Sequence, residues 1–588
     1  MGKRKVAGTA IGSAAIVRLV TAIGLAAMLA GLADAQVNSV RIAGGHPDEA
    51  SELTARVAPG RTLHMTITLA LHDREGLSAL LAAQQDPSSP EYHKWLTPAQ
   101  FNARFGPTEA DVLSVRDWLT QQGFKVDFAS ADSRTIAFHS DAATAERAFS
   151  VRIAASPEGK TFANLDDPAI PTELASKVGA ISGLSNTVHH RPAVKVRPGA
   201  KTIPAAGPPF GPKQVWNFYD YTTLEGTGVV GSSSDCIALI EVSDVDSAGS
   251  ISGFDSEFGL PSPTLTTIFA DDGSDPGAIL GDSLEAVVDI EVANAAAPGT
   301  PIRDYVGDDN VSDSAGGGLQ DALQRAVSDN LCGQISMSFG FCGEPKLFYT
   351  EVFDQIFAQA EAQGQGVYVA AGDQGAAGLM FNARSDECVP GSSRHVSEVA
   401  ADPHVTAVGG TQFQETGENS SFVAESVWDD PAKLIFEGQE GTLPAADRDG
   451  TGGGVSQYFP KPTFQNGVTP NDNHRDVPDV SFVASGYFPG LEVFFGGQVT
   501  LIEGTSFGTP WWAAISALAG QEAGSRIGNL NPAIYALGAK SNSALHDVVT
   551  GNNSLHGVTG FSARKGYDCA TGWGTPDIGL LVPLLAGS

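Results

Sequence analysis

The chain has 588 residues, of which 42% are hydrophobic, and its 35 basic and 67 acidic side chains give a formal net charge of −32. This length is too great for one ordinary domain, so we expect at least two folded units with large cores. The negative charge repels nucleic acid and anionic membranes, and neither is expected as a partner. It suits a protein that works in acid, where many carboxylates are protonated, and equally one that only needs solubility.

The start of the chain has the pattern of a secretory signal peptide. It carries three basic residues at 3–5, an apolar segment at 19–32 and the small-x-small site Ala33-Asp34-Ala35. A membrane anchor is the alternative, but Arg18 shortens the apolar run below the ~20 residues that a span needs. We therefore assign residues 1–35 to a signal peptide and expect a secreted protein, extracellular or periplasmic, without membrane contact after signal removal.

Residues 36–190 mix strand and helix patterns and predict an α+β domain. Strands are expected at 63–71, 135–140 and 148–155, and helices at 75–85 and 109–123. Residues 189–212 follow, rich in proline, glycine and basic side chains and with little apolar periodicity. This composition predicts an exposed linker that is easily cut, and we place the linker and processing region at 191–209.

Residues 210–588 alternate short apolar runs with helical patterns. The runs lie at 236–242, 333–340, 366–375 and 404–411, and the helical patterns at 283–297, 319–328 and 349–363. Such alternation predicts an α/β domain with a mostly parallel sheet flanked by helices. Ligand sites in these sheets gather at the carboxyl ends of the strands.

Five cysteines allow two internal disulfides in an oxidising compartment: Cys236, Cys332, Cys342, Cys388 and Cys569. Cys332 and Cys342 are close in the sequence, so we expect them to pair. None of the cysteine spacings forms a zinc site, and no histidine stands near these cysteines to make a Cys/His nucleophile.

The stretch 501–520 places a Gly-Thr-Ser directly before the apolar pattern of a buried helix. Pro510 is tolerated in a first helical turn, so Ser506 is expected at the helix N-terminus. Orphan backbone N–H groups there stabilise negative charge beside the hydroxyl, which suits a nucleophile. The alternative is an N-cap serine without chemistry. A serine nucleophile also needs a base.

The usual base, a histidine oriented by an aspartate, has no suitable motif in the second domain. The histidines there are His395, His404, His474, His546 and His556. None opens a helix in the His-Gly-Thr setting of a subtilisin-type hydrolase, which argues against that enzyme class.

Carboxylates offer another base. Glu285 and Asp289 are four residues apart in a helical pattern, so they lie a turn apart on one face among apolar neighbours. Two carboxylates so placed share a proton and their pKa values separate, although an acidic helix start is an alternative explanation. Asp373, between Gly372 and Gly375 after a strand, is a third acid of interest, or an Asx-turn residue.

In this order, Glu-x-x-x-Asp, Gly-Asp-x-Gly and Gly-Thr-Ser-x-x-x-Pro resemble the motifs of the sedolisin (serine-carboxyl) peptidases. Four further segments are similar to segments of that family: ISMSFG from Ile335, VTAVGGT from Val405, GGGVSQYFPKPTFQ from Gly452 and RDVPDVS from Arg475. The segment from Asp86 to Val112 resembles the family's pro-kumamolisin activation propeptide. The resemblance covers nearly the whole chain after the signal peptide.

The resemblance implies a subtilisin-like fold in which Ser506 attacks a peptide carbonyl, Glu285 accepts its proton and Asp289 orients Glu285. Asp373 would be the oxyanion acid, neutral so that it can donate a hydrogen bond. The resemblance also implies protein or peptide substrates and the chain's own propeptide as an intramolecular inhibitor, and we expect a monomer. The basic-rich linker at 189–212 precedes an acidic domain, so we expect a zymogen that activates itself in acid by a cut within this linker, with trimming by a separate protease as the alternative.

The C-terminal region is similar to the family's calcium site. By position, the resemblance implies one Ca²⁺ held by carboxylates and by backbone carbonyls: Asp547 and Asp568, and Val548, Arg564 and Gly566. An all-oxygen set suits Ca²⁺ rather than zinc. Ordinary Asx-turns are the alternative.

Two residues depart from the family pattern. Glu503 stands where a small residue is usual, which is expected to alter substrate contacts near the nucleophile, and Phe339 stands where Trp or Tyr is common. We expect a secreted endopeptidase. A tripeptidyl aminopeptidase of the same family and a catalytically silent secreted binding protein remain the alternatives.

Overall fold

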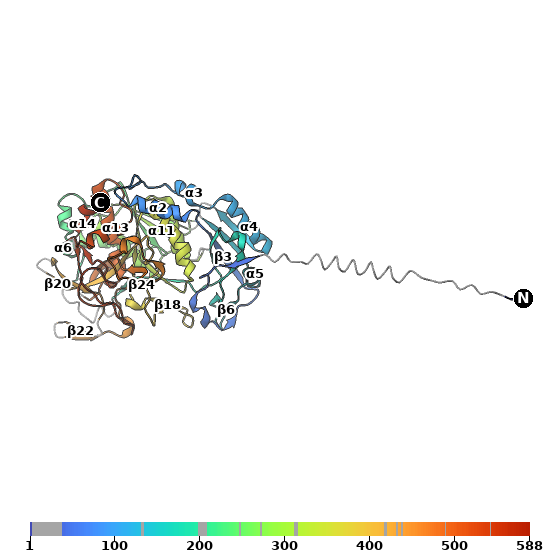
Figure 1. Ribbon diagram of the computed structural model, residues 1–588. Helices are drawn as coiled ribbons and strands as arrows, with labels where there is room; N and C mark the ends of the chain where they lie inside the picture. The colour runs from blue at the N-terminus through green and yellow to red at the C-terminus, as the bar shows by residue number, and fades with distance from the viewer. Residues whose placement is uncertain are drawn as a thin grey trace.

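The computed structural model describes residues 1–2, 38–130, 134–197, 209–245, 248–270, 273–310, 316–416, 420–430, 433–436, 439–487, 490–540 and 543–587. The predicted signal peptide lies outside the described residues apart from its first two. Figure 1 shows the N-terminal elements β3, α4 and α5 gathered at one side of the molecule and the elements of the second domain at the other.

The N-terminal domain is built on a four-stranded antiparallel sheet in the order β4-β5-β3-β9. Its strands are β3 (Thr62–Leu69), β4 (Lys125–Ser130), β5 (Thr135–Asp141) and β9 (Val178–Ser182), and its covering helices are α4 (Glu109–Gln122) and α5 (Ala142–Phe149). Alternate strand residues and one face of each helix form a buried core. The expectation of a strand at 148–155 is wrong at its start, because Asp141 caps a helix that runs to Phe149, and the strand β6 begins only at Ile153.

Two helices of the N-terminal domain, α2 (Arg74–Gln84) and α3 (Pro98–Phe105), pack against α11 (Asp354–Ala362) of the second domain. Their apolar side chains, with one leucine just before α2, form one shared cluster with two alanines of α11: Leu71, Leu77, Leu80, Leu81, Phe101, Phe105, Ala358 and Ala362. The N-terminal domain is thus docked through a hydrophobic contact, with the side chains of Arg74 and Glu351 forming an ion pair beside it.

The second domain contains an eight-stranded sheet in the order β13-β14-β12-β15-β17-β20-β21, with β26 also paired to β20. All these pairings are parallel except that of β20 with β21. The strands are β12 (Ile237–Glu241), β13 (Leu265–Phe269), β14 (Ile302–Val306), β15 (Gln334–Met337), β17 (Gly366–Ala370), β20 (Thr406–Thr416), β21 (Phe422–Val427) and β26 (Val480–Val483). The mostly parallel α/β sheet predicted from the alternating pattern is confirmed.

Helices cover both faces of this sheet. One face carries α9 (Asp282–Ala296), α12 (Gly508–Ala523) and α14 (Ile578–Ala586), and the other carries α10 (Gly317–Asp329) and α11. Successive residues of β12 point to opposite layers, so that Ile237 and Leu239 join the first and Ala238 and Ile240 join the second. Both α9 and α12 are buried almost all round, which places their polar side chains in the core.

The disulfides join Cys236 to Cys332 and Cys342 to Cys388, and Cys569 is a buried free thiol. The expected pair of Cys332 and Cys342 is therefore wrong. Between these two cysteines the chain runs through the strands β15 and β16 (Phe339–Cys342), and ten extended residues span roughly 30 Å. Cys236 instead meets Cys332 because their following strands, β12 and β15, are neighbours in the sheet.

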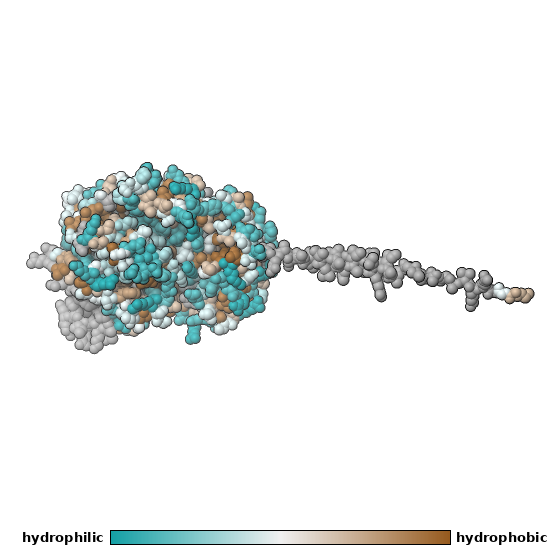
Figure 2. Space-filling view, viewed as in Figure 1, coloured by the Kyte–Doolittle hydropathy of each residue, from teal (hydrophilic) through white to brown (hydrophobic). Residues whose placement is uncertain are grey.

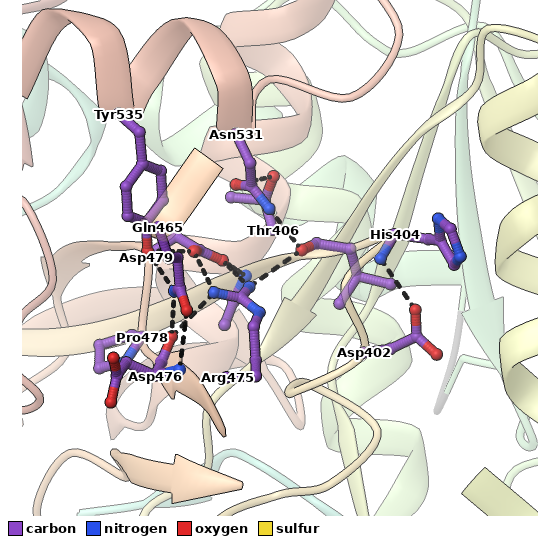
Figure 3. A network of polar contacts seen from close by, with 12 residues as sticks. Asp402, His404, Thr406, Gln465, Arg475, Asp476, Pro478, Asp479, Asn531 and Tyr535 are labelled. Atoms are coloured by element: carbon purple, nitrogen blue, oxygen red, sulfur yellow. Dashed lines mark hydrogen bonds and ion pairs between the residues drawn. The ribbon is translucent and has the colours of Figure 1, made fainter. Parts of the chain in front are cut away.

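A buried ion pair joins several segments of the second domain (Figure 3). Arg475 and Asp479 are both fully buried, and the guanidinium donates to the two carboxylate oxygens at 2.7 and 2.6 Å. Asp479 also accepts hydrogen bonds from the hydroxyl of Tyr535 and from the backbone N–H of Ala407. The pair therefore links β20, the segment before β26 and helix α13 (Asn531–Gly538).

The described start of the predicted linker, residues 189–197, is paired with other strands and partly buried, whereas residues 198–208 of that linker lie outside the described residues. Residues 189–192 form β10, antiparallel to β16, and residues 195–196 form β11, antiparallel to β28 (Gln498–Glu503). Ala193, Val194 and Arg197 are buried. Proline and basic residues are common in linkers, but here their backbone hydrogen bonds are made by strands distant in the sequence.

The face shown in Figure 2 has hydrophilic residues interspersed with smaller hydrophobic areas. Among the residues that the structure describes, no helix combines the length and the apolar character needed to cross a membrane.

Candidate active site

Ser506 lies where the sequence predicts it, in a 3-10 turn (Thr505–Phe507) that leads directly into α12. The side chain is fully buried, and its hydroxyl donates a long hydrogen bond of 3.4 Å to the carbonyl of Ser338. The preceding Gly504 has φ +145°, and a Cβ there would lie 2.1 Å from the carbonyl oxygen of Ala193. Glycine is thus required because another backbone passes so close to the turn.

Glu285 and Asp289 face the same interior from the first and second turns of α9, and both are fully buried. Burial, and then the neighbouring charge of Asp289, raise the pKa of Glu285 well above its usual value. The hydroxyl of Ser506 acts in the opposite direction and lowers it. The hydroxyl of Ser338 lies 3.0 and 2.9 Å from the two carboxylate oxygens of Asp289 and donates to this carboxyl.

Two further buried carboxyls extend this pair, and the sequence analysis missed them. Glu241 ends β12, and Asp304 lies in β14, the next strand of the sheet. Burial first, and then Asp289, Asp304 and Glu285, raise the pKa of Glu241 well above its usual value. A glutamate at the carboxyl end of an otherwise apolar strand was the available signal, since ligand sites gather at that edge.

Asp373 lies just after β17, at the same edge of the sheet. Its Oδ1 atom accepts hydrogen bonds from the backbone N–H and the hydroxyl of Thr505, at 2.9 and 2.8 Å. Burial, followed by the charge of Asp449, raises the pKa of Asp373 to about 8. The carboxyl is therefore neutral in acid, and because Oδ1 is occupied as an acceptor, Oδ2 is the oxygen free to carry the proton.

Residues 191–196 run through this cluster as an extended segment. The backbone N–H of Ala193 donates to the carbonyl of Ser338 at 2.9 Å, and its carbonyl accepts from the backbone N–H of Ser506 at 3.1 Å. On one side of Ala193, Arg191 is paired with Gly340, and on the other side Lys195 is paired with Glu503. Ala193 and Asp373 line one small cavity of about 20 Å³, which has room for roughly one water molecule.

The structure thus brings the four predicted residues together. The pKa of Glu285 responds to Asp289, Ser506 and Asp373, so all three act on one carboxyl. The histidines of this domain have other partners: His404 contacts Glu361, and His395 contacts Gln457. No hydrogen bond joins a histidine to Ser506 within the described part of the chain.

The residues expected at a calcium site also lie together. Asp568 is buried, and its carboxylate accepts backbone hydrogen bonds from Arg564, Ala570 and Thr571, while Asp547 accepts one from Gly566 at 2.9 Å. Burial raises the pKa of both carboxyls.

The donor set fits a calcium ion. Among the described residues, no salt bridge neutralises Asp568. No described residue donates a hydrogen bond to the backbone carbonyls of Val548, Arg564 and Gly566. Two carboxylates and three free carbonyls form an oxygen set of the kind that Ca²⁺ prefers.

A second group of possible ligands lies elsewhere: Asp354, Asp402 and His404 have ligand atoms within 4.8 Å of one another. The pKa of His404 is raised to about 10, because Glu361 and the two aspartates outweigh the opposing effect of burial. A protonated imidazole has no free lone pair for a metal. This group is accordingly an ion-pair network, and Figure 3 shows Asp402 and His404 beside the Arg475 network.

Comparison with known proteins agrees with these observations. A family model described as "Pro-kumamolisin, activation domain" matches residues 49–187. The chain is 30% identical to sedolisin from Pseudomonas sp. (strain 101), over 89% of this chain and 87% of that one. It is 28% identical to kumamolisin from Bacillus sp. (strain MN-32), over 85% of this chain and 88% of that one.

The fold is also similar to a solved structure. Pseudomonas sedolisin, a serine-carboxyl proteinase complexed with two molecules of pseudo-iodotyrostatin, matches with a TM-score of 0.54 and 28% identity, over 64% of this chain and 97% of that one. The mixed α/β architecture, the N-terminal activation domain and the sequence identity all point the same way. The chain belongs to the sedolisin family of serine-carboxyl peptidases.

Proposed function

We propose that the chain is a zymogen of a secreted, acid-acting endopeptidase, with Ser506 as nucleophile, Glu285 and Asp289 as its base system and Asp373 as oxyanion acid. The observation that carries this proposal is the hydrogen bonding of Ala193, whose N–H and carbonyl are held by Ser338 and Ser506. A peptide carbonyl fixed beside a buried serine has the position of a bond about to be attacked.

In the proposed reaction the hydroxyl oxygen of Ser506 bonds to the carbonyl carbon, and its proton passes to Glu285. Asp289, held by Ser338, keeps the shared proton of the pair, which leaves Glu285 free to accept. The developing oxyanion receives hydrogen bonds from the Ser506 N–H and from the neutral Asp373. Collapse breaks the C–N bond, and Glu285 returns the proton to the leaving nitrogen. Water then hydrolyses the acyl-enzyme by the same steps.

The electrostatics support work in acid. With a pKa of about 8, Asp373 retains the proton that its proposed role requires at all lower pH values. The raised pKa values of Glu285 and Asp289 mean that the pair keeps a proton as well. A histidine base would be protonated and inactive under the same conditions, since its ordinary pKa is about 6.5.

The strand pairing on the N-terminal side of Ala193 favours internal cleavage over removal of tripeptides. Ahead of Ala193, the four residues His189–Pro192 pair with β16, so the groove holds more than three residues before the reacting bond. A tripeptidyl aminopeptidase of the same family is the second candidate. Its substrate groove would be closed beyond the third residue before the reacting bond. A silent binding protein is disfavoured because all four catalytic positions are filled.

The test uses the full chain after acid treatment and two peptides of identical sequence, one with a free and one with an acetylated N-terminus. An endopeptidase cuts both at the same internal bond. Cleavage confined to the free peptide, three residues from its N-terminus, would establish the tripeptidyl alternative, and no cleavage of either by folded protein would overturn the proposed enzyme.

Further parts of the proposal concern organisation and ligands. We place the propeptide at 36–190, a processing region at 191–209 and the peptidase domain at 210–588, with export directed by residues 1–35. The propeptide is the intramolecular inhibitor, one Ca²⁺ binds at Asp547 and Asp568, and the mature enzyme is a monomer without nucleic-acid or membrane partners.

A further inference from the structure

We propose that Glu503 and Asp449 form a subsite that selects a lysine or arginine at the second residue after the cleaved bond. This inference rests on the proposed peptidase activity and adds the kind of substrate that the site prefers. Lys195 of the processing region occupies the subsite and shows how a substrate side chain is held.

The position of Lys195 follows from backbone pairing. With the Ala193 carbonyl on the Ser506 N–H, the reacting bond joins Ala193 to Val194, and Lys195 is the second residue beyond it. Lys195 pairs with Glu503, three residues before the serine, in an antiparallel ladder. Any peptide that binds in the same register places its second residue after the bond at this point, because strand pairing fixes the side-chain positions.

The ammonium group of Lys195 is surrounded by oxygen atoms. Its Nζ lies 2.5 Å from Asp449 Oδ2, 3.2 Å from Glu503 Oε1 and 3.0 Å from the carbonyl oxygen of Asp447. Asp449 and Glu503 are buried, whereas about a quarter of the Lys195 side chain is exposed. The acids therefore form the floor of a pocket, and the lysine enters it from the solvent side.

Glu503 has little other support. Its only ion pair in the described part of the chain is with Lys195, and neither of its carboxylate oxygens accepts another hydrogen bond there. Asp430 stands behind it but is held by the backbone N–H of Asp449 and the indole N–H of Trp428, at 3.0 Å each. Lys195, the ion-pair partner of this buried glutamate, belongs to the segment that is removed. Once that segment leaves, Glu503 can bind the cationic side chain of a substrate in its place.

The charge balance explains the selectivity. Burial, and then Asp430, raise the pKa of Glu503 well above its usual value even though Lys195 acts in the opposite direction, so its charged form depends on a neighbouring cation. Burial lowers the pKa of Lys195, but Asp449 and Glu503 outweigh it, so the lysine remains charged. An apolar residue in the same place would remove the cation that stabilises the charged form of these buried carboxyls, and an acidic residue would add repulsion.

The test begins with the full chain, activated by its own acid treatment. The substrate is the acetylated and amidated peptide of residues 190–196, His-Arg-Pro-Ala-Val-Lys-Val, and its variants carry Arg, Leu or Glu in place of Lys. We expect kcat/KM for Lys and Arg to exceed that for Leu by at least about tenfold, with Glu cut most slowly. In Glu503→Gln protein the preference for Lys over Leu should fall toward one.

The matched control is Glu492→Gln. Glu492 lies on β27 (Leu491–Phe495), which pairs with the other edge of β28 from the one that pairs with Lys195, and it stands opposite Leu501 rather than Glu503. This variant should keep the wild-type ratio. Equal kcat/KM for the Lys and Leu peptides in wild type would overturn the subsite while leaving the peptidase proposal intact.

A second measurement needs no peptidase activity and so separates the two proposals. In the full-length Ser506→Ala precursor at neutral pH, cleavage by added trypsin after Lys195 should be slow because the pocket holds the side chain. Glu503→Gln in that background should raise the rate at Lys195 about tenfold or more, and Glu492→Gln should not. An unchanged rate in the Glu503→Gln precursor would overturn the inference even if none of the peptides were cut.

Discussion

The backbone N–H of Ser506 donates a hydrogen bond to the carbonyl oxygen of Ala193 at 3.1 Å, so the chain carries a peptide bond in register with its own candidate nucleophile. Val194 follows that bond, and both residues are buried. Under the proposed function, the segment that blocks the site would also be its first substrate, held in the same place.

The first prediction concerns this bond. When the full chain is moved from neutral pH to about pH 4, near the ordinary carboxyl pKa values, early products should include one whose N-terminus is Val194. Ser506→Ala should slow this cleavage by at least about 10³-fold, since the nucleophile cannot be replaced by binding alone. N-terminal sequencing at early times measures both. Ser516→Ala, a serine of the same helix, is the control, and processing of Ser506→Ala at the wild-type rate would contradict self-cleavage.

The second prediction concerns Asp373. Because its pKa is raised to about 8, wild-type activity should fall as pH rises through that value and the carboxyl loses its proton. Asp373→Asn keeps a donor that does not titrate, so this fall should disappear while the maximal kcat drops by about 10²-fold from imperfect geometry. A pH profile of kcat for the two proteins tests this, and an unchanged alkaline limb in the variant would remove Asp373 from its proposed role.

The third prediction concerns stability. Several buried carboxyls have raised pKa values, among them Asp304 at about 8 and Glu425 at about 7, mainly because burial disfavours the charged form. Between the unfolded and folded pKa values the folded chain binds more protons, so its stability is greatest in acid and is lost as pH rises through about 7 to 8.

Thermal unfolding of the Ser506→Ala precursor should therefore give a higher Tm at pH 5 than at pH 8, with a difference in unfolding free energy on the order of a few kcal/mol. The alanine variant prevents self-digestion during the measurement. A Tm that rises steadily from pH 5 to pH 8 would mean that other groups dominate the proton balance.

The fourth prediction concerns calcium. Since the ion binds only the folded loop, Ca²⁺ at a hundred times its Kd should add about 2.7 kcal/mol to the unfolding free energy. A chelator should lower Tm, and Asp568→Asn should remove most of the response to added Ca²⁺. Asp577→Asn, which alters a carboxylate that caps helix α14, serves as a control that keeps the response. A wild-type Tm indifferent to chelator would remove the metal from the proposal.

The sequence predicts what depends on local pattern. The helices α9 and α12 and the strand β17 are found where periodicity and motifs predict them, so the positions of Glu285, Asp373 and Ser506 on their elements follow correctly. The α/β class follows in the same way, from strands and helices that alternate along the chain.

What the sequence does not predict depends on contacts between distant segments. The disulfide from Cys236 to Cys332 requires knowing which strands are neighbours, and closeness in the sequence is misleading when the chain between two cysteines is extended. The pairing of residues 189–192 with β16 and of residues 195–196 with β28 has the same origin, because both partner strands are distant in the sequence. The sequence shows that Glu503 departs from the family pattern, but its pairing with Lys195 depends on the fold.

Both disulfides lie within residues 236–388, so neither ties the N-terminal domain to the rest of the chain. Before the cut, the covalent connection keeps the inhibitory domain at a high effective concentration next to the active site, so the domain rebinds each time it dissociates. After the cut, the same contacts hold two separate molecules, and the fraction of propeptide that stays bound depends on the protein concentration. Dilute surroundings, as outside a cell, would then make activation irreversible without any further chemical step.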